Sequence, residues 1–388
     1  MKKLVFDTAI TGHHSEYIGH LIDYLFEVNQ IQTEYYFVVH PNFSNTFPKI
    51  FDKASKVKNV HWRPISDSEL RRIEGKNGVW SSLMAFRTMD TYAKKLEVNH
   101  VIALDFHPVK YGSIFYTPSY TISSILFLLF HRLDKTNKNQ KIEYYKRYFF
   151  SKWNSANKQL KKIFILNDLD AVAFMNKEFN TNCFTMLPDP IPKLKPLENF
   201  NIYEYYEIGQ ERNIFLHIGA LGDRKGTREV IETAKYLSKA NQKKIAILLA
   251  GKASKVEDEE LYLELIETLK KNTEVQIIWD NQFVPNQMMK SLFDQCDTVL
   301  LPYKNAEFSS GILGHAAAAN KRVIATNAGL IRELVVKYRL GELLNEPTSR
   351  EIAKKMTQLL NEKFNTTGQS SFVKEHSPMT FAKLILNS

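Results

Sequence analysis

Short apolar runs and amphipathic stretches alternate along the whole chain. After the first apolar run, the residues Ile18, Leu21, Ile22 and Leu25 recur at intervals of three and four, which is the period of one face of an amphipathic helix. Apolar runs that are joined by such helices are typical of parallel strands buried on both faces. The pattern therefore predicts an α/β protein.

The same reading gives the bounds of the individual elements. In the first half, strands are expected at 5–10, 35–39, 60–62, 101–104, 114–116, 163–166 and 183–187, and helices at 15–28, 79–96, 142–160 and 169–178. In the second half, strands are expected at 214–218, 245–250, 275–279, 298–301 and 322–326. The helices expected there span 228–240, 257–271, 286–295, 311–319, 331–338, 349–360 and 378–386.

A proline-rich segment separates the two halves. Four prolines lie within residues 188–196, and a polar stretch follows them, so regular structure is expected to stop there. A length of 388 residues suits two domains. We expect an N-terminal Rossmann-like domain at 1–190, a linker at 191–212, a C-terminal Rossmann-like domain at 213–370, and a tail helix at 371–388 that packs back on the first domain. Ligands of such sheets bind at the carboxyl ends of the strands, which predicts a cleft between facing domains.

Cysteine content and apolar runs bear on the compartment. The two cysteines, Cys183 and Cys296, are far apart in the sequence, and a disulfide framework needs more than such a pair. The first apolar run is too short for a signal peptide and reads as a first strand. The longest run, near 122–130, is about half of the ~20 residues that a membrane span needs. The expected location is the cytoplasm.

The positive charge of the chain, +10 in total, is concentrated in one segment. Residues 134–162 contain nine Lys and Arg and two acidic residues. Aromatic residues are interleaved with these charges: Tyr144, Tyr145, Tyr148, Phe149, Phe150 and Trp153. This composition is typical of a segment that binds an anionic membrane, so residues 122–162 are one candidate for contact with the cytoplasmic face of a membrane. The alternative is a solvated basic helix whose aromatic residues pack on their own domain. Nucleic acid is disfavoured because no recognition motif accompanies the segment.

Two loops of the second half have the features of a phosphate or nucleotide site. One is the segment 219–227, Gly-Ala-Leu-Gly-Asp-Arg-Lys-Gly-Thr, which follows an expected strand and opens a helix. The other is the segment 307–315, Glu-Phe-Ser-Ser-Gly-Ile-Leu-Gly-His, which has a carboxylate before a helix of small residues. Free backbone N–H groups at a helix start favour anions. The glycine spacing departs from Gly-x-Gly-x-x-Gly, which disfavours a dinucleotide-dependent dehydrogenase.

Together these loops resemble the donor half of the retaining GT-B glycosyltransferases, and family 4 (glycosyl transferases group 1) in particular. The resemblance is carried by residues 213–346 and is looser over 1–190. It implies two Rossmann-like domains and the transfer of a sugar from a nucleotide-diphosphate sugar to a glycan or lipid-linked acceptor, as in polysaccharide biosynthesis. It also implies retention of the anomeric configuration and no metal or other cofactor.

The resemblance assigns roles to residues of both loops. Arg224 and Lys225 would stabilise the diphosphate as charge develops on it, and Gly219 would let the donor approach the backbone. Family members carry a Glu-x7-Glu motif whose first carboxylate, here Glu307, lies near the donor sugar. The second position, which holds the ribose, is His315 here; an imidazole makes fewer hydrogen bonds than a carboxylate, and a core histidine is the alternative. Donors to the distal phosphate are expected from the residues that open the helix: Ser309, Ser310 and Gly311.

The first half offers further candidates after two of its strands. Gly12 lies in the loop that this family places toward the donor phosphate, followed by His13 and by Ser15, a natural helix N-cap. Asp105 and His107 follow the strand 101–104, where active-site groups collect. The resemblance makes His107 a candidate for orienting the sugar or the acceptor, with His13 and Asp105 as secondary contacts.

The sequence Asp168-Leu169-Asp170 matches the Asp-x-Asp pattern by which another glycosyltransferase fold holds a metal ion. Because Asp168 directly precedes an expected helix, a helix cap is the preferred interpretation.

Two other classes of function remain open. A nucleotide-sugar epimerase or a phosphorylase could use the same fold. The second alternative is a non-catalytic peripheral membrane or polymer-binding protein with a decayed donor site. The presence of His315 at the second acidic position of the motif keeps this alternative open.

Overall fold

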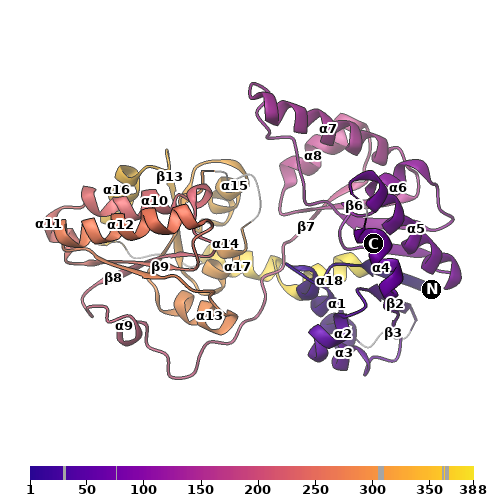
Figure 1. Ribbon diagram of the computed structural model, residues 1–388, viewed down its shortest axis with the longest axis horizontal. Helices are drawn as coiled ribbons and strands as arrows, with labels where there is room; N and C mark the ends of the chain where they lie inside the picture. The colour runs from indigo at the N-terminus through magenta and orange to yellow at the C-terminus, as the bar shows by residue number, and fades with distance from the viewer. Residues whose placement is uncertain (29–31, 76, 305–309, 361, 363–366) are drawn as a thin grey trace. The chain divides into compact units, whose positions relative to one another are not determined.

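The computed structural model describes residues 1–28, 32–75, 77–304, 310–360, 362 and 367–388. The chain forms two compact units (Figure 1), of which the first comprises Met1–Pro190 with Ser377–Ser388 and the second comprises Ile191–His376. Each unit is a parallel sheet with helices packed against it. The predicted α/β class is confirmed.

The sheet of the first unit has seven parallel strands in the order β3-β2-β1-β4-β5-β6-β7. The strands are β1 (Lys2–Asp7), β2 (Glu34–Val39), β3 (Val60–Trp62), β4 (His100–Ala103), β5 (Thr121–Ile125), β6 (Leu160–Leu166) and β7 (Phe184–Leu187). The helices are α1 (His14–Val28), α2 (Phe43–Thr46), α3 (Pro48–Ala54), α4 (Asp67–Glu74), α5 (Val79–Lys95), α6 (Lys110–Phe115), α7 (Lys138–Ser155), α8 (Leu169–Phe179) and α18 (Pro378–Leu386). Because successive side chains of a strand point to opposite faces, Leu4 and Phe6 of β1 enter one core while Val5 enters the other.

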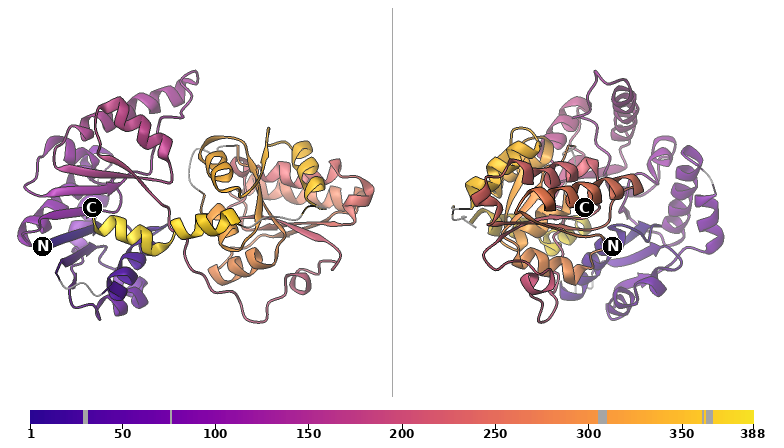
Figure 2. Two further views of the ribbon diagram at one scale, coloured as in Figure 1. Left: turned by 180° about the vertical axis from the view of Figure 1, so that it is seen from behind. Right: turned by 60° about the vertical axis from the view of Figure 1, so that its left-hand side comes forward.

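The helix α18, near the end of the chain, completes the first unit. The rings of Phe381 in α18 and Tyr17 in α1 lie 4.7 Å apart, and Phe381 is fully buried. The Nζ atom of Lys3 donates a hydrogen bond of 2.6 Å to the carbonyl oxygen of Leu386. Of the yellow helices in Figure 2, α18 is the one at the C-terminal end of the chain, which packs on α1 beside the indigo strands and helices of the N-terminal part.

The sheet of the second unit has six parallel strands in the order β10-β9-β8-β11-β12-β13. The strands are β8 (Asn213–Ile218), β9 (Ile245–Ala250), β10 (Gln276–Asp280), β11 (Thr298–Leu301), β12 (Arg322–Thr326) and β13 (Gly341–Leu344). The α-helices are α9 (Ile202–Tyr205), α10 (Thr227–Glu232), α11 (Lys239–Gln242), α12 (Val256–Asn272), α13 (Asn286–Gln295), α14 (Gly311–Ala318), α15 (Gly329–Tyr338), α16 (Ser349–Leu359) and α17 (Thr367–Glu375), and the 3-10 helices are η1 (Asp223–Lys225) and η2 (Thr233–Tyr236).

The ends of the second unit differ from the segments drawn from the sequence. Ile202 is fully buried in its core, and Leu197 N–H donates 2.8 Å to the hydroxyl of Ser291, so part of the segment 191–212 packs on the second unit. The residue at 371, expected to begin the tail, lies inside α17, whose Phe372 is buried in the same core.

The expected strand at 114–116 is wrong, because these residues end the helix α6 and leave it. Helix α6 packs closely on α5: a Cβ atom at Gly112 would lie 2.1 Å from the ring of Phe86. On the side away from β1, β4 pairs with β5, Thr121–Ile125. Because β5 contains two serines, it does not form an apolar run in the sequence. Ser124 is nevertheless buried, and its hydroxyl donates a hydrogen bond of 2.7 Å to the carbonyl oxygen of Ala103.

Several helix bounds also differ from the prediction. The expected single helix at 228–240 is broken into α10, η2 and α11, because Leu237 is extended and Ser238 caps a new helix. Helix α1 begins at His14, so Ser15 lies inside it and is not its N-cap. Helix α7 begins earlier than expected because Asn137 accepts hydrogen bonds from the N–H groups of the first turn.

Candidate functional site

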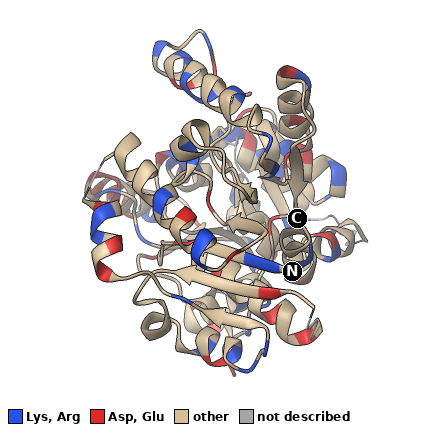
Figure 3. Ribbon diagram, turned by 90° about the vertical axis from the view of Figure 1, so that its right-hand side faces the viewer, with Lys and Arg blue, Asp and Glu red and all other residues tan. Residues whose placement is uncertain are grey.

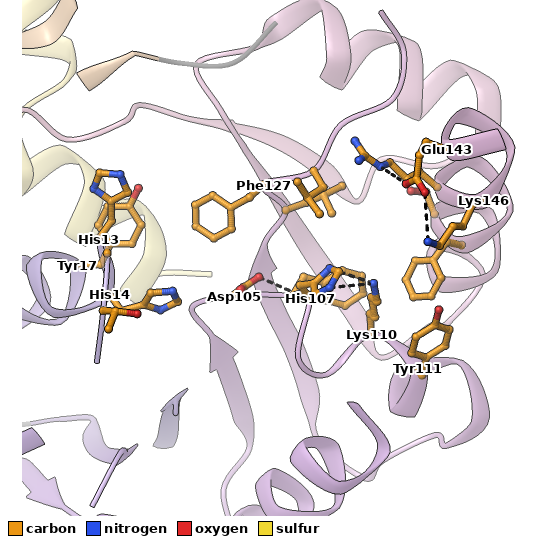
Figure 4. A pocket seen from close by; sticks show the side chains of 18 residues that line it. His13, His14, Tyr17, Asp105, His107, Lys110, Tyr111, Phe127, Glu143 and Lys146 are labelled. Atoms are coloured by element: carbon orange, nitrogen blue, oxygen red, sulfur yellow. Dashed lines mark hydrogen bonds and ion pairs between the residues drawn. The ribbon is translucent and has the colours of Figure 1, made fainter. Parts of the chain in front are cut away.

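The first unit contains a cavity of about 520 Å³ at the carboxyl ends of its central strands (Figure 4). The loop after β1, the loop after β4, the segment after β5 and helix α7 all line it. This is the edge of a parallel sheet where ligands bind. Of the residues predicted from sequence, Gly12, His13, Asp105 and His107 all line this cavity.

A histidine–carboxylate pair lies at one end of the cavity. Asp7, the buried last residue of β1, has a carboxylate oxygen 2.7 Å from Nδ1 of His14 and accepts a 3.0 Å hydrogen bond from the N–H of Ala9. Burial disfavours the charged ring, but the hydrogen bond and negative charge of Asp7 outweigh it and raise the pKa of His14. In the neutral ring, a proton on Nδ1 facing Asp7 leaves Nε2 as a hydrogen-bond acceptor.

The neighbouring histidine has a looser environment. The side chain of His13 is 74% exposed and its Nδ1 lies 3.7 Å from Glu16, whose hydrogen bond raises the pKa of His13. Gly12 precedes it at φ +69, a conformation that favours glycine. Sequence reasoning selected His13 from this loop, whereas the structure gives His14 the fixed contact.

The loop after β4 places a second set of polar groups in the cavity. The carboxylate of Asp105 accepts a 2.8 Å hydrogen bond from the backbone N–H of His107, and burial raises the pKa of Asp105. The Nζ atom of Lys110 lies 3.0 Å from Nδ1 of His107. Burial and the nearby charge of Lys110 lower the pKa of His107, so its ring is neutral at pH 7 and can accept a hydrogen bond.

Lys110 is the central cation of this cavity. Its Nζ lies over the rings of Phe150 and Tyr111, at 5.0 and 5.3 Å from their centroids. Burial and the charge of Lys146 lower the pKa of Lys110 to about 8. Figure 4 places it between His107 and Lys146, on the side of the cavity away from His13 and His14.

Helix α7 supplies charged groups that the sequence did not connect to the site. Glu143 pairs with Lys146 at 3.3 Å and with Arg147 at 3.4 Å, and Arg147 also donates 2.7 Å to the carbonyl oxygen of Leu129. Their spacing of three and four marks one helix face. The spacing does not say which face meets a cavity, since that depends on how α7 packs.

In the second unit, the loop after β8 buries the lysine that was predicted to bind phosphate. Lys225 is 7% exposed, and its Nζ donates 2.9 Å to the carbonyl oxygen of Ile218. Burial and the charge of Arg224 lower its pKa to about 8, and it forms no salt bridge with any described residue. Gly219 has φ +115, and a Cβ there would lie 2.2 Å from Nζ. The glycine therefore makes room for the cation.

Buried polar contacts hold this loop in shape. The hydroxyl of Thr227 accepts a 3.0 Å hydrogen bond from the N–H of Gly222 and lies 3.0 Å from Nε2 of His217. Burial lowers the pKa of His217 to about 4, so the ring is neutral at pH 7. Gly226 has φ +70, and a Cβ there would lie 2.3 Å from the carbonyl oxygen of Pro302.

Acidic residues of this loop and of helix α10 pair with another lysine. Lys304 forms an ion pair with Asp223 and, at 2.8 Å, with Glu229. Arg224 is exposed, with its guanidinium carbon 5.8 Å from the centroid of Tyr303. The loop thus offers one exposed and one buried cation.

The second predicted donor loop is described only in part. Glu307 and Ser309 lie outside the described residues. Ser310 and Gly311 begin α14, and the Ser310 side chain makes no capping hydrogen bond. The ring of His315 is half-buried and stacks on Phe293, with centroids 5.6 Å apart.

Asp168 is a helix cap, as predicted. Its carboxylate accepts a 2.7 Å hydrogen bond from the N–H of Ala171 and pairs with Arg132. Among the residues that the structure describes, no group of three His, Cys, Asp or Glu side chains is placed to hold a metal ion.

The family match and the structural neighbours agree with this architecture. Residues 201–373 match the model of the family "Glycosyl transferases group 1". The structure of WaaG, a glycosyltransferase involved in lipopolysaccharide biosynthesis, aligns over 100% of both chains with a TM-score of 0.62 and 14% identity. This chain has the GT-B fold.

Two further structures share the fold. A glycosyltransferase from Rickettsia africae ESF-5 aligns over 100% of this chain and 96% of its own, with a TM-score of 0.69 and 14% identity. Anabaena Alr3699/HepE, solved in complex with UDP-glucose, aligns over 100% of this chain and 98% of its own, with a TM-score of 0.66 and 13% identity. No curated protein sequence matches the chain.

Proposed function

We propose that this protein is a glycosyltransferase that takes a sugar from a nucleotide-diphosphate donor. The observation that carries the proposal is Lys225, a buried lysine with no carboxylate partner among the described residues, beside the exposed Arg224 in a glycine-rich loop. A buried cation of this kind costs free energy unless an anion offsets it. The family match to glycosyl transferases group 1 covers this loop, and UDP-glucose is bound by one structural neighbour.

In the proposed reaction, the bond between the anomeric carbon and the distal phosphate breaks as the bond from that carbon to an acceptor hydroxyl forms. The electron pair leaves with the nucleoside diphosphate, and the hydroxyl proton passes to a phosphate oxygen. Arg224 and Lys225 stabilise the charge that develops on the diphosphate. Ser310 and Gly311, at the start of α14, and Gly219 complete the donor contacts, and His315 contacts the ribose.

The remaining assignments follow the family resemblance. Glu307 and Ser309 belong to the donor site, and the configuration of the sugar is retained. The cations and backbone N–H groups of the second unit replace a metal ion. In the first unit, the cavity with His13, Asp105 and His107 receives the acceptor, a glycan or a lipid-linked sugar, and Gly12 approaches the donor phosphate.

We also propose that helix α7 holds the protein on an anionic membrane surface. Among the described residues, no helix combines the length and apolar character that a membrane crossing requires. One face of α7 nevertheless exposes an apolar stripe at helical spacing: Ile142, Tyr145, Phe149 and Trp153. Lysines flank this stripe, and Figure 3 shows α7 at the top of the view with more blue than red along it. Apolar insertion beside basic residues is the pattern of an interfacial helix.

Two tyrosines of α7 do not belong to this exposed stripe. Tyr144 is buried with its ring 5.2 Å from that of Phe130, and Tyr148 donates 2.8 Å to Glu178. These two tyrosines pack on their own domain, as the alternative interpretation expected. The exposed stripe alone carries the membrane proposal.

The proposed function is tested by measuring the melting temperature of the full chain with UDP-, GDP- and ADP-sugars. A donor at 100 times its Kd should stabilise the protein by about 2.7 kcal/mol. Stabilisation by one nucleotide-sugar series, lost in Arg224→Ala, supports the proposal. A protein that none of these compounds stabilises would instead fit a decayed donor site.

A further inference from the structure

We propose that the cavity of the first unit binds an acceptor that carries a phosphate group next to an apolar moiety, with Lys110, Lys146 and Arg147 holding the phosphate. This rests on the proposed function, in which the cavity receives the acceptor, and it names the chemical class of that acceptor. The three cations were not among the residues selected from the sequence.

The charges around Lys110 leave it without a paired anion. Of the carboxylates near it, Glu143 is engaged by both Lys146 and Arg147, and Asp105 accepts from the N–H of His107. Among the described residues, Lys110 forms no salt bridge; its nearest polar contact is the ring of His107, at 3.0 Å. Three cations therefore face two carboxylates, so this part of the cavity carries a net positive charge.

The ammonium group of Lys110 is half-buried and close to a second lysine, Lys146. Its Nζ is held over two aromatic rings, Phe150 and Tyr111, and burial with the like charge of Lys146 disfavours its protonated form. A phosphate monoester carries between one and two negative charges at pH 7 and three acceptor oxygens. It can therefore contact cations from both α6 and α7 at once, which a single carboxylate does less completely.

Apolar side chains line a large part of the remaining cavity wall. Leu126, Phe127 and Leu128 follow β5 along it, and Phe106 and Phe150 complete it. A free inorganic anion would leave these groups without a partner, whereas an alkyl or prenyl phosphate would cover them. Figure 4 places His13 and His14 at the other side of the same cavity, so one molecule can reach both groups.

Binding can be measured on the full chain by calorimetry, without a donor, at pH 7. The probes are octyl phosphate, octyl glucoside and octanoate, each below its micelle concentration, and inorganic phosphate. We expect octyl phosphate to bind at least about tenfold more tightly than each of the other three, which is the worth of one charge-assisted contact. Equal binding of octyl phosphate and octyl glucoside would overturn the proposal, because the cavity would then be a simple apolar pocket.

Variants locate the site and test the sign of each charge. Lys110→Gln should weaken octyl phosphate binding about tenfold or more, while Glu143→Gln, which frees two cations, should tighten it. Lys158→Gln is the matched control, because Lys158 is exposed and does not line the cavity. Equal loss in Lys158→Gln and Lys110→Gln would show a diffuse charge effect and contradict the site.

The pH dependence separates Lys110 from the other cations. The charged or titratable groups that face it are Asp105, His107, Tyr111, Glu143, Lys146 and Arg147. Since Lys110 loses its proton near pH 8, octyl phosphate affinity should fall as the pH rises above that value, whereas Lys110→Arg should keep its affinity at pH 9. An identical fall in Lys110→Arg would contradict the assignment.

Failure of the phosphate site and failure of the proposed function give different experimental results. If nucleotide sugars stabilise the protein but octyl phosphate binds no better than octyl glucoside, only the acceptor class is wrong. If no nucleotide sugar binds but octyl phosphate does, the phosphate site stands and the glycosyltransferase assignment falls.

Discussion

The buried Nζ atom of Lys225 donates its 2.9 Å hydrogen bond to the carbonyl oxygen of Ile218, the last residue of β8. Burial and the charge of Arg224 lower the pKa of this lysine to about 8. A bound diphosphate would favour the protonated form and raise that pKa again. We therefore expect nucleotide binding at pH 8 to take up protons, which calorimetry in buffers of different ionisation enthalpy measures.

The variants Lys225→Met and Arg224→Met distinguish the two cations of this loop. Proton uptake should disappear in Lys225→Met and persist in Arg224→Met, because Arg224 stays charged at every accessible pH. Each variant should lower turnover by roughly 10²–10³. Arg224 is exposed, so its loss should not change the melting temperature, whereas Lys225 is buried and its replacement is expected to do so. Unchanged turnover in Arg224→Met would refute the phosphate role.

The pair of Asp7 and His14 predicts a particular pH–rate profile. If the neutral Nε2 of His14 accepts a hydrogen bond from a second, non-reacting hydroxyl of the acceptor and so orients it, activity falls as the pH drops through the raised pKa of His14. Asp7→Asn removes the charge that raises this pKa, so the acid limb should move to lower pH while the maximal rate decreases. The melting temperature of Asp7→Asn must be measured alongside, because Asp7 is buried.

His13→Gln is the control for this pair, since His13 is mostly exposed. It should leave the acid limb in place. An acid limb that does not move in Asp7→Asn contradicts the role of His14.

The anomeric configuration of the product, measured by NMR, is a second test. We expect retention, and an inverted product would instead indicate that His14 acts as a general base.

Glu307→Gln should reduce turnover, and His315→Ala should mainly raise the KM for the donor. A carboxylate at the sugar makes charge-assisted hydrogen bonds, whereas His315, which stacks on Phe293, is expected to hold the nucleotide in the ground state. Steady-state kinetics of both variants with the identified donor measure this contrast. The reverse pattern, with turnover lost only in His315→Ala, would place the acidic role elsewhere.

The exposed face of α7 predicts membrane binding that depends on anionic lipid. The full chain should float with anionic vesicles at low salt and remain unbound with neutral ones, and binding should weaken as salt screens the lysines. Trp153→Ser should reduce binding to anionic vesicles. Trp80→Ser should not, although Trp80 is exposed to a similar degree, 65% against 59%. Equal recovery on neutral and anionic vesicles would leave α7 as a solvated basic helix.

Much of the fold could be predicted from the sequence, because buried parallel strands are short apolar runs. The strands β3, β9, β11 and β12 have the predicted bounds. The strand β5 could not be found this way, since it contains two serines, which are buried and form hydrogen bonds to Ala103 and His100 of β4. The strand β13 and the helix α17 were also missed, although pairing with β12 and the buried Phe372 place them in the second unit.

Site residues could be predicted where they belong to one short sequence motif. They could not be predicted where residues far apart in the sequence come together only in the fold. Arg224 and Lys225 lie in one loop, and the glycines of that loop indicate its backbone conformation. His14 gains its role from Asp7 at the end of β1, and Lys110 gains its surroundings from α7. No spacing in the sequence joins these residues, because the packing of α7 on α6 decides which of its faces lines the cavity.

Sugar transfer is tested most directly by an assay with the nucleotide sugar that stabilises the protein. The acceptor is either a glycan or a sugar linked to octyl phosphate, and the rate is measured with and without EDTA. One glycosylated acceptor should form for each nucleoside diphosphate released, at a rate that EDTA does not change. Isomerised donor without acceptor would indicate an epimerase, and dependence on inorganic phosphate a phosphorylase. Loss of transfer in EDTA with recovery in manganese would contradict the metal-independent mechanism. A nucleotide sugar that stabilises the protein but is never consumed would contradict the proposal that the protein transfers a sugar.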